Sequence, residues 1–181
     1  KRQVLAFMGD VYVGLDARSL SAHEINYAQS HLRILSGLYG ILRPLDLMQP
    51  YRLEMGTQLA TSQGSNLYSF WGNKLAKALN EQARGIRSRY LVNLASHEYF
   101  NAIDTNALEL EVITPIFKER SGDKYRVLSF FVKKTRGMMA RYIIQTRPKR
   151  PEDLRGFDAS GYAFNEDMST DSKLVFTRDK P

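Results

Sequence analysis

The sequence contains no cysteine and only three histidines among its 181 residues. Without a thiol, this chain can form no disulfide, no thiolate metal site and no peroxidatic cysteine. The three histidines, His23, His31 and His97, do not have the spacing of a metal-binding motif such as His-Glu-x-x-His. We therefore expect neither a metal site nor a cofactor.

Long apolar runs are also missing. No segment approaches the ~18 uninterrupted apolar residues of a membrane-spanning helix, and the chain does not open on a signal peptide. We expect no membrane partner. Hydrophobic residues still make up 43% of the chain, which is enough for a core, and the length corresponds to one domain. Residues 4–7 are typical of a buried strand, so we expect the chain to begin inside its domain.

Hydrophobic periodicity predicts an α+β fold, with helices packed on a mixed β-sheet in a single domain spanning residues 1–181. Strands are expected near residues 4–7, 90–94, 110–117, 125–132 and 173–177, and helices near residues 22–34, 66–83 and 136–147. Ser21 and Glu24 have the spacing of a capping box before the first helix. Gly122 and Asp123 predict a hairpin, and Pro115 should place part of its first strand at an edge or a bulge.

Positive charge is concentrated in one segment. The net charge is +7, from 26 basic and 19 acidic residues. Seven of the basic residues lie in residues 133–150, which hold no acidic residue, and the rest of the chain has 19 of each sign. These seven are Lys133, Lys134, Arg136, Arg141, Arg147, Lys149 and Arg150. A local excess of this kind is a candidate surface for a polyanion.

The basic segment is expected to begin a helix capped by Thr135. Lys133, Lys134 and Arg136 would then lie at the helix N-terminus, where their charge adds to the helix dipole. Gly137 falls outside the apolar side of this helix, which is formed by Met138, Met139, Tyr142 and Ile143. A small residue there would admit a second backbone or a phosphate chain. The alternative is a solvated basic face.

A second segment, residues 35–55, combines glycines, prolines and charged residues with apolar ones. Pro44 and Pro50 prevent a regular helix or strand from running through it. Two interpretations remain open for its arginines, Arg43 and Arg52. They either form ion pairs with Asp46 or Glu54 that hold a loop in place, or they are presented to an anion by a rigid loop.

Other polar residues follow expected strands or lie in turns, where site residues often gather. Asp10 either caps a helix over residues 11–15 or belongs to a site. Ser96 suits a helix N-cap, and Glu98 either complements the dipole of that helix or acts as a site acid. No catalytic residue is assigned. The candidate cleft residues are Asp10, Tyr39, Glu54, Asn93, Ser96 and Glu98.

Several of these stretches resemble the YaaA peroxide-stress family of bacteria. The resemblance rests on residues 35–55, Gly9-Asp10-Val11-Tyr12, Asn93-Leu94-Ala95-Ser96 with Glu98-Tyr99-Phe100, and Lys133-Lys134 with Arg136-Gly137. It implies a family-specific fold and a cytoplasmic protein of the oxidative-stress response that binds double-stranded DNA through a positively charged cleft. It also implies that the family domain starts some tens of residues earlier, so that this chain lacks an N-terminal segment.

Two functional hypotheses follow. The first is binding of double-stranded DNA with little sequence preference, because no zinc finger, helix-turn-helix or RRM motif is present. The phosphate contacts would come from Lys133, Lys134, Arg136 and Arg141, helped by Arg43 and Arg52. The second is an enzyme acting on a phosphorylated or nucleotide substrate in the same cleft, although Walker, GxSxG and dinucleotide motifs are absent. The oligomeric state is not predicted.

Overall fold

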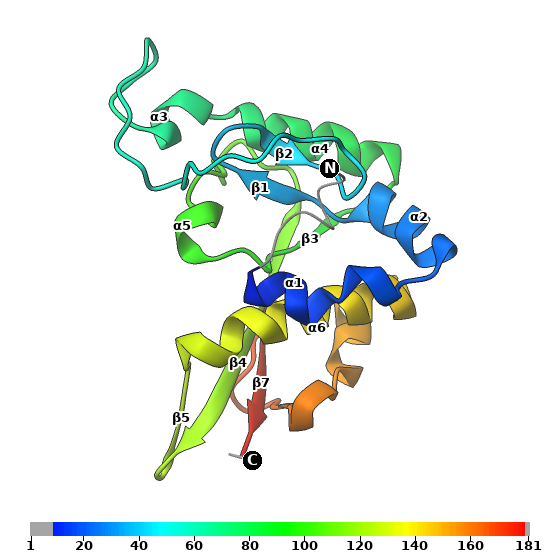
Figure 1. Cartoon of the computed structure of the whole chain (residues 1–181). Helices are drawn as coiled ribbons and strands as arrows, with labels where there is room; N and C mark the ends of the chain where they lie inside the picture. The colour runs from blue at the N-terminus through cyan, green and yellow to red at the C-terminus, as the bar shows by residue number, and fades with distance from the viewer. Residues whose placement is uncertain (1–8, 180–181) are drawn as a thin grey trace. The chain divides into compact units, whose positions relative to one another are not determined.

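The structure is a computed structural model that describes residues 9–179 (Figure 1). The predicted strand at residues 4–7 lies outside the described residues. Internal contacts divide the chain into two compact units, and the boundary between them falls within one helix, after Glu24. Unit 1 contains Ile25–Arg89 and Ala95–Leu110, and unit 2 contains residues 9–24, Tyr90–Leu94 and residues 111–179. Helices and strands occur together as predicted for the α+β class, whereas the single-domain organisation stays a prediction.

Unit 2 is built on a mixed sheet. Its strands follow the order β3-β4-β7-β6, and β5 pairs with the far end of β4. The β3–β4 and β4–β7 pairs are parallel, while β4–β5 and β6–β7 are antiparallel. The bounds are β3 Tyr90–Val92, β4 Glu111–Ser121, β5 Lys124–Arg126, β6 Ala163–Phe164 and β7 Lys173–Arg178. The predicted mixed sheet is therefore confirmed, and three of its predicted strands lie where expected.

The core of unit 2 packs against β4 and β7. Burial alternates along β4, as expected for a strand with one face on a core. Phe117 of β4 has its ring centroid 5.5–5.7 Å from those of Phe157, Tyr162 and Phe176. All four residues are at most 1% exposed. These four are the largest of the fully buried side chains in the described residues, and aromatic side chains dominate the energetics of a core.

Pro115 lies in the middle of β4 without disturbing the sheet. Thr114 donates its N–H to Ser172 on the β7 side, so Pro115 faces the opposite side of the strand. Among the residues described, pairing with β3 ends at Ile113 and pairing with β5 begins at Glu119. The missing N–H of Pro115 therefore costs no ladder hydrogen bond, in agreement with the predicted local edge.

The hairpin after β4 is shorter than predicted. β5 ends at Arg126, and helix α6, Ser129–Thr146, begins three residues later. The predicted strand is thus wrong for residues 127–132, of which 129–132 are helical, and the predicted helix began seven residues too late. The segment is rich in β-branched and aromatic residues, but Val132, Thr135 and Met139 are buried at helical spacings of three and four. Packing on the core overrides the local β preference.

Helix α1, Asp10–Leu15, crosses α6 at very short range, and Figure 1 shows the two helices crossing. A Cβ atom added to Gly14 would lie 1.9 Å from the carbonyl oxygen of Lys134, and one added to Gly137 would lie 1.9 Å from that of Val11. Only glycine at both positions permits this contact. The space predicted beside Gly137 is therefore occupied by a protein backbone.

Shorter helical turns complete unit 2. They are η2 (Ala17–Ser19), η3 (Pro151–Gly156) and η4 (Ala159–Gly161). The capping box before helix α2, Ala22–His31, forms as predicted. Ser21 donates its N–H to the Glu24 carboxylate at 2.6 Å, and Glu24 donates its N–H to the Ser21 hydroxyl at 3.3 Å. These bonds lower the pKa of Glu24.

Unit 1 consists of short elements joined by irregular segments. The antiparallel strands are β1 Ile34–Ser36 and β2 Gly40–Leu42, and the helices besides the end of α2 are α3 Leu67–Trp71, α4 Lys74–Gly85 and α5 His97–Phe100. One helix prediction was too long, and another missed a break. α2 ends at His31, and the helix predicted over residues 66–83 is interrupted at Gly72, whose φ of 48° cannot continue a right-handed helix.

Candidate nucleic-acid interface

The twelve predicted site residues are divided equally between the two units. Unit 2 holds Asp10, Asn93, Lys133, Lys134, Arg136 and Arg141, and unit 1 holds Tyr39, Arg43, Arg52, Glu54, Ser96 and Glu98. Each set is described below within its own unit. Their convergence in one cleft stays a prediction.

The basic residues of α6 do not lie where the helix begins. The helix starts at Ser129 after Leu128, which supplies no side-chain cap. The predicted cap, Thr135, is buried inside the helix and donates its hydroxyl to the Phe131 carbonyl at 3.0 Å. Lys133 and Lys134 therefore belong to the second turn, and the predicted addition of their charge to the helix N-terminus is wrong. The helix dipole acts mainly within the first turn.

Lys133 and Lys134 are exposed on α6. Among the carboxylates that the structure describes in unit 2, none forms an ion pair with either lysine or with Arg136. Arg136 is partly buried, and this burial lowers the pKa of its guanidinium, which nevertheless stays charged near neutrality. These three side chains lie within residues 133–136 of one helix, and we call them the α6 basic cluster.

Arg141 has a different role. Its guanidinium donates to the carbonyl oxygens of Leu15 (3.1 Å) and Asp16 (3.0 Å) at the end of α1, and it lies 3.8 Å from the Asp16 carboxylate. Arg150 is likewise paired, at 3.3 Å from Asp153. Part of the charge excess of residues 133–150 is thus neutralised by acids from other segments. Arg141 stabilises the contact between α1 and α6.

Asp10 and Asn93 both lie in unit 2. Gly9 is the N-cap residue of α1, and Asp10 is the first residue of the helix, with an exposed side chain. The alternative that Asp10 caps this helix is therefore wrong. Asn93 follows β3 and continues its ladder, with its N–H donating to the Ile113 carbonyl at 2.8 Å.

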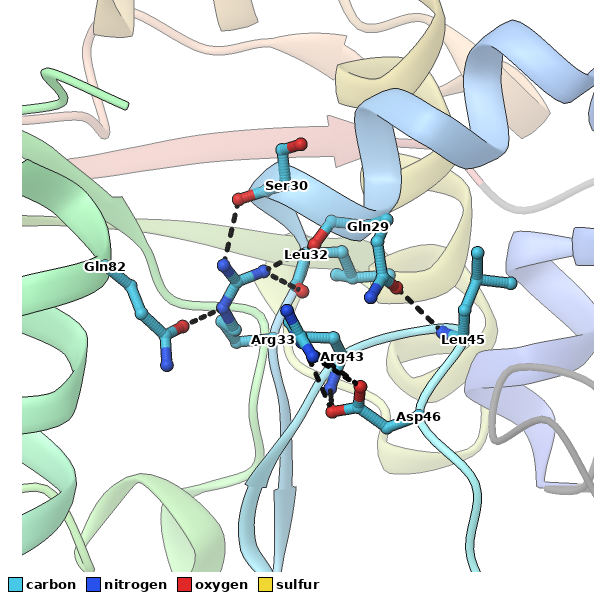
Figure 2. A network of polar contacts seen from close by, with 8 residues as sticks. All are labelled: Gln29, Ser30, Leu32, Arg33, Arg43, Leu45, Asp46 and Gln82. Carbon is cyan, nitrogen blue, oxygen red and sulfur yellow. Dashed lines mark hydrogen bonds and ion pairs between the residues drawn. The ribbon is translucent and has the colours of Figure 1, made fainter. Parts of the chain in front are cut away.

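In unit 1, Arg43 forms the ion pair that the sequence left open (Figure 2). Its guanidinium lies 3.0 Å from Asp46, and the Asp46 carboxylate also accepts the Arg43 backbone N–H at 2.9 Å. The hydrogen bonds and charge of Arg43 outweigh partial burial and lower the pKa of Asp46. The structural interpretation therefore holds for Arg43. Arg52 is exposed and, in the part of unit 1 that the structure describes, forms no ion pair with Glu54.

A residue that sequence reasoning missed, Arg33, organises this region (Figure 2). It donates to the carbonyl oxygens of Gln29 (3.2 Å), Ser30 (3.0 Å) and Leu32 (2.7 Å), and so satisfies the end of α2. Its Nε also donates to the Gln82 side chain of α4. Burial, with a smaller effect of nearby Arg43, lowers the pKa of Arg33. An arginine just after a helix is the signal that could have identified this role.

The remaining candidates of unit 1 surround an irregular loop. Ser96 caps α5 as predicted, accepting the Tyr99 N–H at 3.4 Å. Glu98 accepts the N–H of Gly56 in the loop at 2.9 Å. Burial, and to a lesser extent Tyr51 and the charges of Glu98 and Glu54, raises the pKa of Tyr99. The structure thus brings Glu54 and Glu98 near one tyrosine.

Tyr39 contributes to the same region. Its ring meets that of Tyr51 edge-on at 5.5 Å, and its hydroxyl accepts the Gln49 N–H at 3.4 Å. The Tyr51 hydroxyl in turn bonds to the fully buried Ser36 hydroxyl. These contacts hold the loop in place and do not by themselves form a catalytic arrangement.

A shallow pocket in unit 2 has a different composition. It has a volume of about 220 Å³ and is lined by Tyr90, Glu111, Pro151, Glu152, Arg155, Asp171 and Leu174. Three of these residues are acidic and one is basic, so the pocket does not favour a phosphate. None of the twelve predicted site residues lines it.

Within residues 9–179, no three His, Asp or Glu side chains gather as they would around a metal ion. No helix in that part of the chain is both long enough and apolar enough to cross a membrane.

Comparison with known proteins gives a family. The model of the family described as "Peroxide stress protein YaaA" matches residues 1–168. A UPF0246 protein of Saccharophagus degradans is 58% identical over 175 residues, which cover 97% of this chain and 68% of the relative. UPF0246 protein IL2146 of Idiomarina loihiensis is 56% identical over 173 residues, covering 96% of this chain and 67% of the relative. The matched relatives are thus longer than this chain, which belongs to the YaaA family of peroxide stress proteins.

Proposed function

We propose that this protein binds double-stranded DNA, largely without sequence preference, as part of the response to peroxide stress. The observation that carries the proposal is the α6 basic cluster, Lys133, Lys134 and Arg136. These residues lie close together on one helix and, among the described carboxylates of unit 2, have no ion-pair partner. The family supplies the context of peroxide stress.

Cations on a helix that pair with none of the described carboxylates of unit 2 are suited to phosphate contacts. Each Lys or Arg that neutralises a DNA phosphate releases about one counterion, which provides binding energy and makes the affinity fall with salt. Such contacts do not read the base sequence. Arg141 is a weaker candidate than the sequence suggested, because it is engaged with α1. Arg43 is weakened in the same way by Asp46, whereas Arg52 is exposed.

The pocket lends no support to the alternative function, an enzyme acting on a phosphorylated or nucleotide substrate. Its three carboxylates would repel a phosphate, and its arginine, Arg155, is partly engaged by Glu166 at 4.0 Å. Chemistry at a peroxidatic thiol is excluded in this chain because it has no cysteine. Binding that shields DNA or recruits other factors requires neither a phosphate-binding pocket nor a reactive thiol.

The proposal is tested by measuring the affinity for a fluorescent DNA duplex at several salt concentrations. Replacing Lys133, Lys134 and Arg136 together by Ala should weaken binding and flatten the log–log salt slope by about two to three, because Arg136 is only partly accessible. The fold should be retained, as judged by circular dichroism, since two of the three side chains are exposed.

The matched control removes the same charge from scattered exposed lysines. Lys77 lies on α4, Lys124 on β5 and Lys173 on β7. Their combined replacement by Ala should leave the salt slope nearly unchanged. Equal weakening by both triple variants would mean that only net charge matters, and the α6 basic cluster would not be the site. Failure of the unmodified protein to bind DNA would reject the function itself.

A further inference from the structure

A network of polar side chains lies inside unit 2, and the proposed function does not use it. Glu119 of β4 is 2% exposed. One oxygen of its carboxylate accepts a hydrogen bond from Arg178 at 2.8 Å and another from the Tyr162 hydroxyl at 2.9 Å. Tyr162 is 1% exposed, and the Arg178 side chain is 11% exposed. A charged pair is thus removed from solvent at the end of the sheet.

Arg178 connects this pair to two further segments. It donates to the carbonyl oxygen of Ser160 at 3.1 Å, within η4, where Ser160 has a φ of 58°. Its guanidinium lies 4.7 Å from the centre of the Tyr162 ring and 5.0 Å from that of Phe131. Phe131 belongs to the first turn of α6. One side chain therefore links β4, β7, η4 and the start of α6.

Thr135 extends the network one turn further along α6. It is 3% exposed and donates its hydroxyl to the Phe131 carbonyl. It also lies near enough to Tyr162 to offset part of the effect of burial, which raises the pKa of Tyr162. The start of α6 has no side-chain cap of its own, because Leu128 precedes it. The contact of Arg178 with Phe131 therefore takes the place of a side-chain cap in holding the first turn.

Stability alone does not explain a buried ion pair. Removing two charges from water is costly, and replacing such a pair by apolar residues of similar size is often neutral or stabilising. The arrangement here also includes an unsatisfied polar group, because the Arg178 Nε is buried without a hydrogen-bond partner in the part of the chain that the structure describes. The directional hydrogen bonds that Glu119 and Arg178 make instead specify a single geometry, because only one placement of the connected segments forms all of these bonds together.

We propose that Glu119, Tyr162 and Arg178 are positioning residues that fix the first two turns of α6, residues 129–136, in one place on the sheet. Lys133 and Lys134 lie in this stretch. By fixing this stretch, the network would also hold the two lysines in position to contact DNA, and this second claim rests on the proposed function. The fixing of the helix start does not depend on that function and can be tested without DNA.

The experiment replaces the network by apolar groups in the full chain, with Glu119→Leu, Tyr162→Phe and Arg178→Met combined. The midpoint of urea denaturation should stay at or above that of the unmodified protein. Hydrogen exchange of the amides of residues 129–136 should nevertheless accelerate about tenfold relative to residues 139–146. The affinity for a DNA duplex should fall by roughly 2- to 30-fold with an unchanged salt slope, because no phosphate contact is removed.

Two further variants distinguish a specific role of the network from a general effect of removing an ion pair. Arg178→Lys keeps the charge but cannot contact Glu119 and Ser160 with one planar fork, so it should also accelerate exchange at residues 129–136. It decides the question if the triple variant does not fold. The matched control is the exposed ion pair Arg84–Glu109, with 64% and 60% exposed side chains. Its replacement by Met and Leu should leave exchange at residues 129–136 unchanged.

The outcomes separate the two claims. Unchanged exchange at residues 129–136 in both the triple variant and Arg178→Lys would overturn the positioning role. Faster exchange with an unchanged DNA affinity would support the positioning of the helix start and overturn its link to DNA binding. If the unmodified protein binds no DNA, the proposed function fails, and the exchange data alone decide whether the network fixes α6.

Discussion

The two units are stabilised in different ways. In unit 2, the core is a cluster of aromatic and aliphatic side chains around β4 and β7, where Phe117, Phe157, Tyr162 and Phe176 contact one another. In unit 1, polar side chains reach across the chain to backbone groups. Asn80, for example, bonds to the Ala107 carbonyl and the Glu109 N–H, both at 2.9 Å. A short irregular structure can thus be ordered by specific hydrogen bonds where long elements are missing.

The largest effect is expected where unit 2 brings two backbones together. Gly137→Ala would place a Cβ atom 1.9 Å from the Val11 carbonyl oxygen, so α1 would have to move away from α6. We expect the free energy of unfolding, measured by urea denaturation, to fall by about 3 kcal/mol or more. The loss should appear although alanine is intrinsically the better helix residue.

Gly85→Ala is the control for this substitution. Gly85 ends α4, and a Cβ atom added there meets nothing within 4 Å. Its replacement should raise the free energy of unfolding by about 0.4–1 kcal/mol, because the unfolded chain loses freedom. If Gly137→Ala also proved stabilising, the close crossing of α1 and α6 would be incorrect.

A smaller effect is expected in unit 1, at one of its buried polar side chains, Asn80. Asn80→Ala would leave a carbonyl and an N–H without partners beside a side chain that is only 5% exposed. The free energy of unfolding should fall by about 2–3 kcal/mol. Asn73 on the same helix is exposed and makes no cap hydrogen bond, so Asn73→Ala should change stability by less than about 0.5 kcal/mol. Equal effects of the two substitutions would refute the account of unit 1 given above.

The smallest effect concerns one tyrosine from each unit, the partly buried Tyr99 and the buried Tyr162. Burial is the main cause that raises the pKa of both Tyr99 and Tyr162. The unfolded chain therefore releases these protons near pH ~10 while the folded chain still holds them. The contribution of these two tyrosines to folding stability should be constant below this range and fall as the pH rises through it.

Urea denaturation at mildly and at strongly alkaline pH would measure this decline. Tyr99→Phe and Tyr162→Phe should each make stability less dependent on pH in the alkaline range, whatever they do to stability at neutrality. A decline as steep as that of the unmodified protein in both variants would show that other groups are responsible.

Sequence patterns predicted unit 2 better than unit 1. β3, β4 and β7 follow from apolar and β-branched runs, which record burial directly. The start of α6 was missed because Val132 and its apolar neighbours suit a strand as well as a helix, and only the core decides between them. In unit 1, Arg33 and Gln82 are 49 residues apart, and Glu98 and Gly56 are 42 apart. Contacts of this kind leave no local pattern to read.

The candidate site shows the same limit. The charge excess of residues 133–150 is visible in the sequence, and Lys133 and Lys134 are indeed exposed. The sequence could not reveal that Arg141 is held by Asp16, 125 residues away. For Arg43, an ion pair with the nearby Asp46 was one of two interpretations that the sequence left open. The structure shows this ion pair. Net charge therefore overstates the number of cations that are free to meet a phosphate.

The crossing of α1 and α6 also affects the rates of folding and unfolding. A helix of six residues, as α1 is, does not form alone in water, because nucleation costs more than a few hydrogen bonds return. α1 therefore becomes helical only on docking to α6, where Arg141 binds the carbonyl oxygens at its end. Docking should follow the transition state for folding. Substitutions in α1 should then hasten unfolding while leaving the folding rate nearly unchanged.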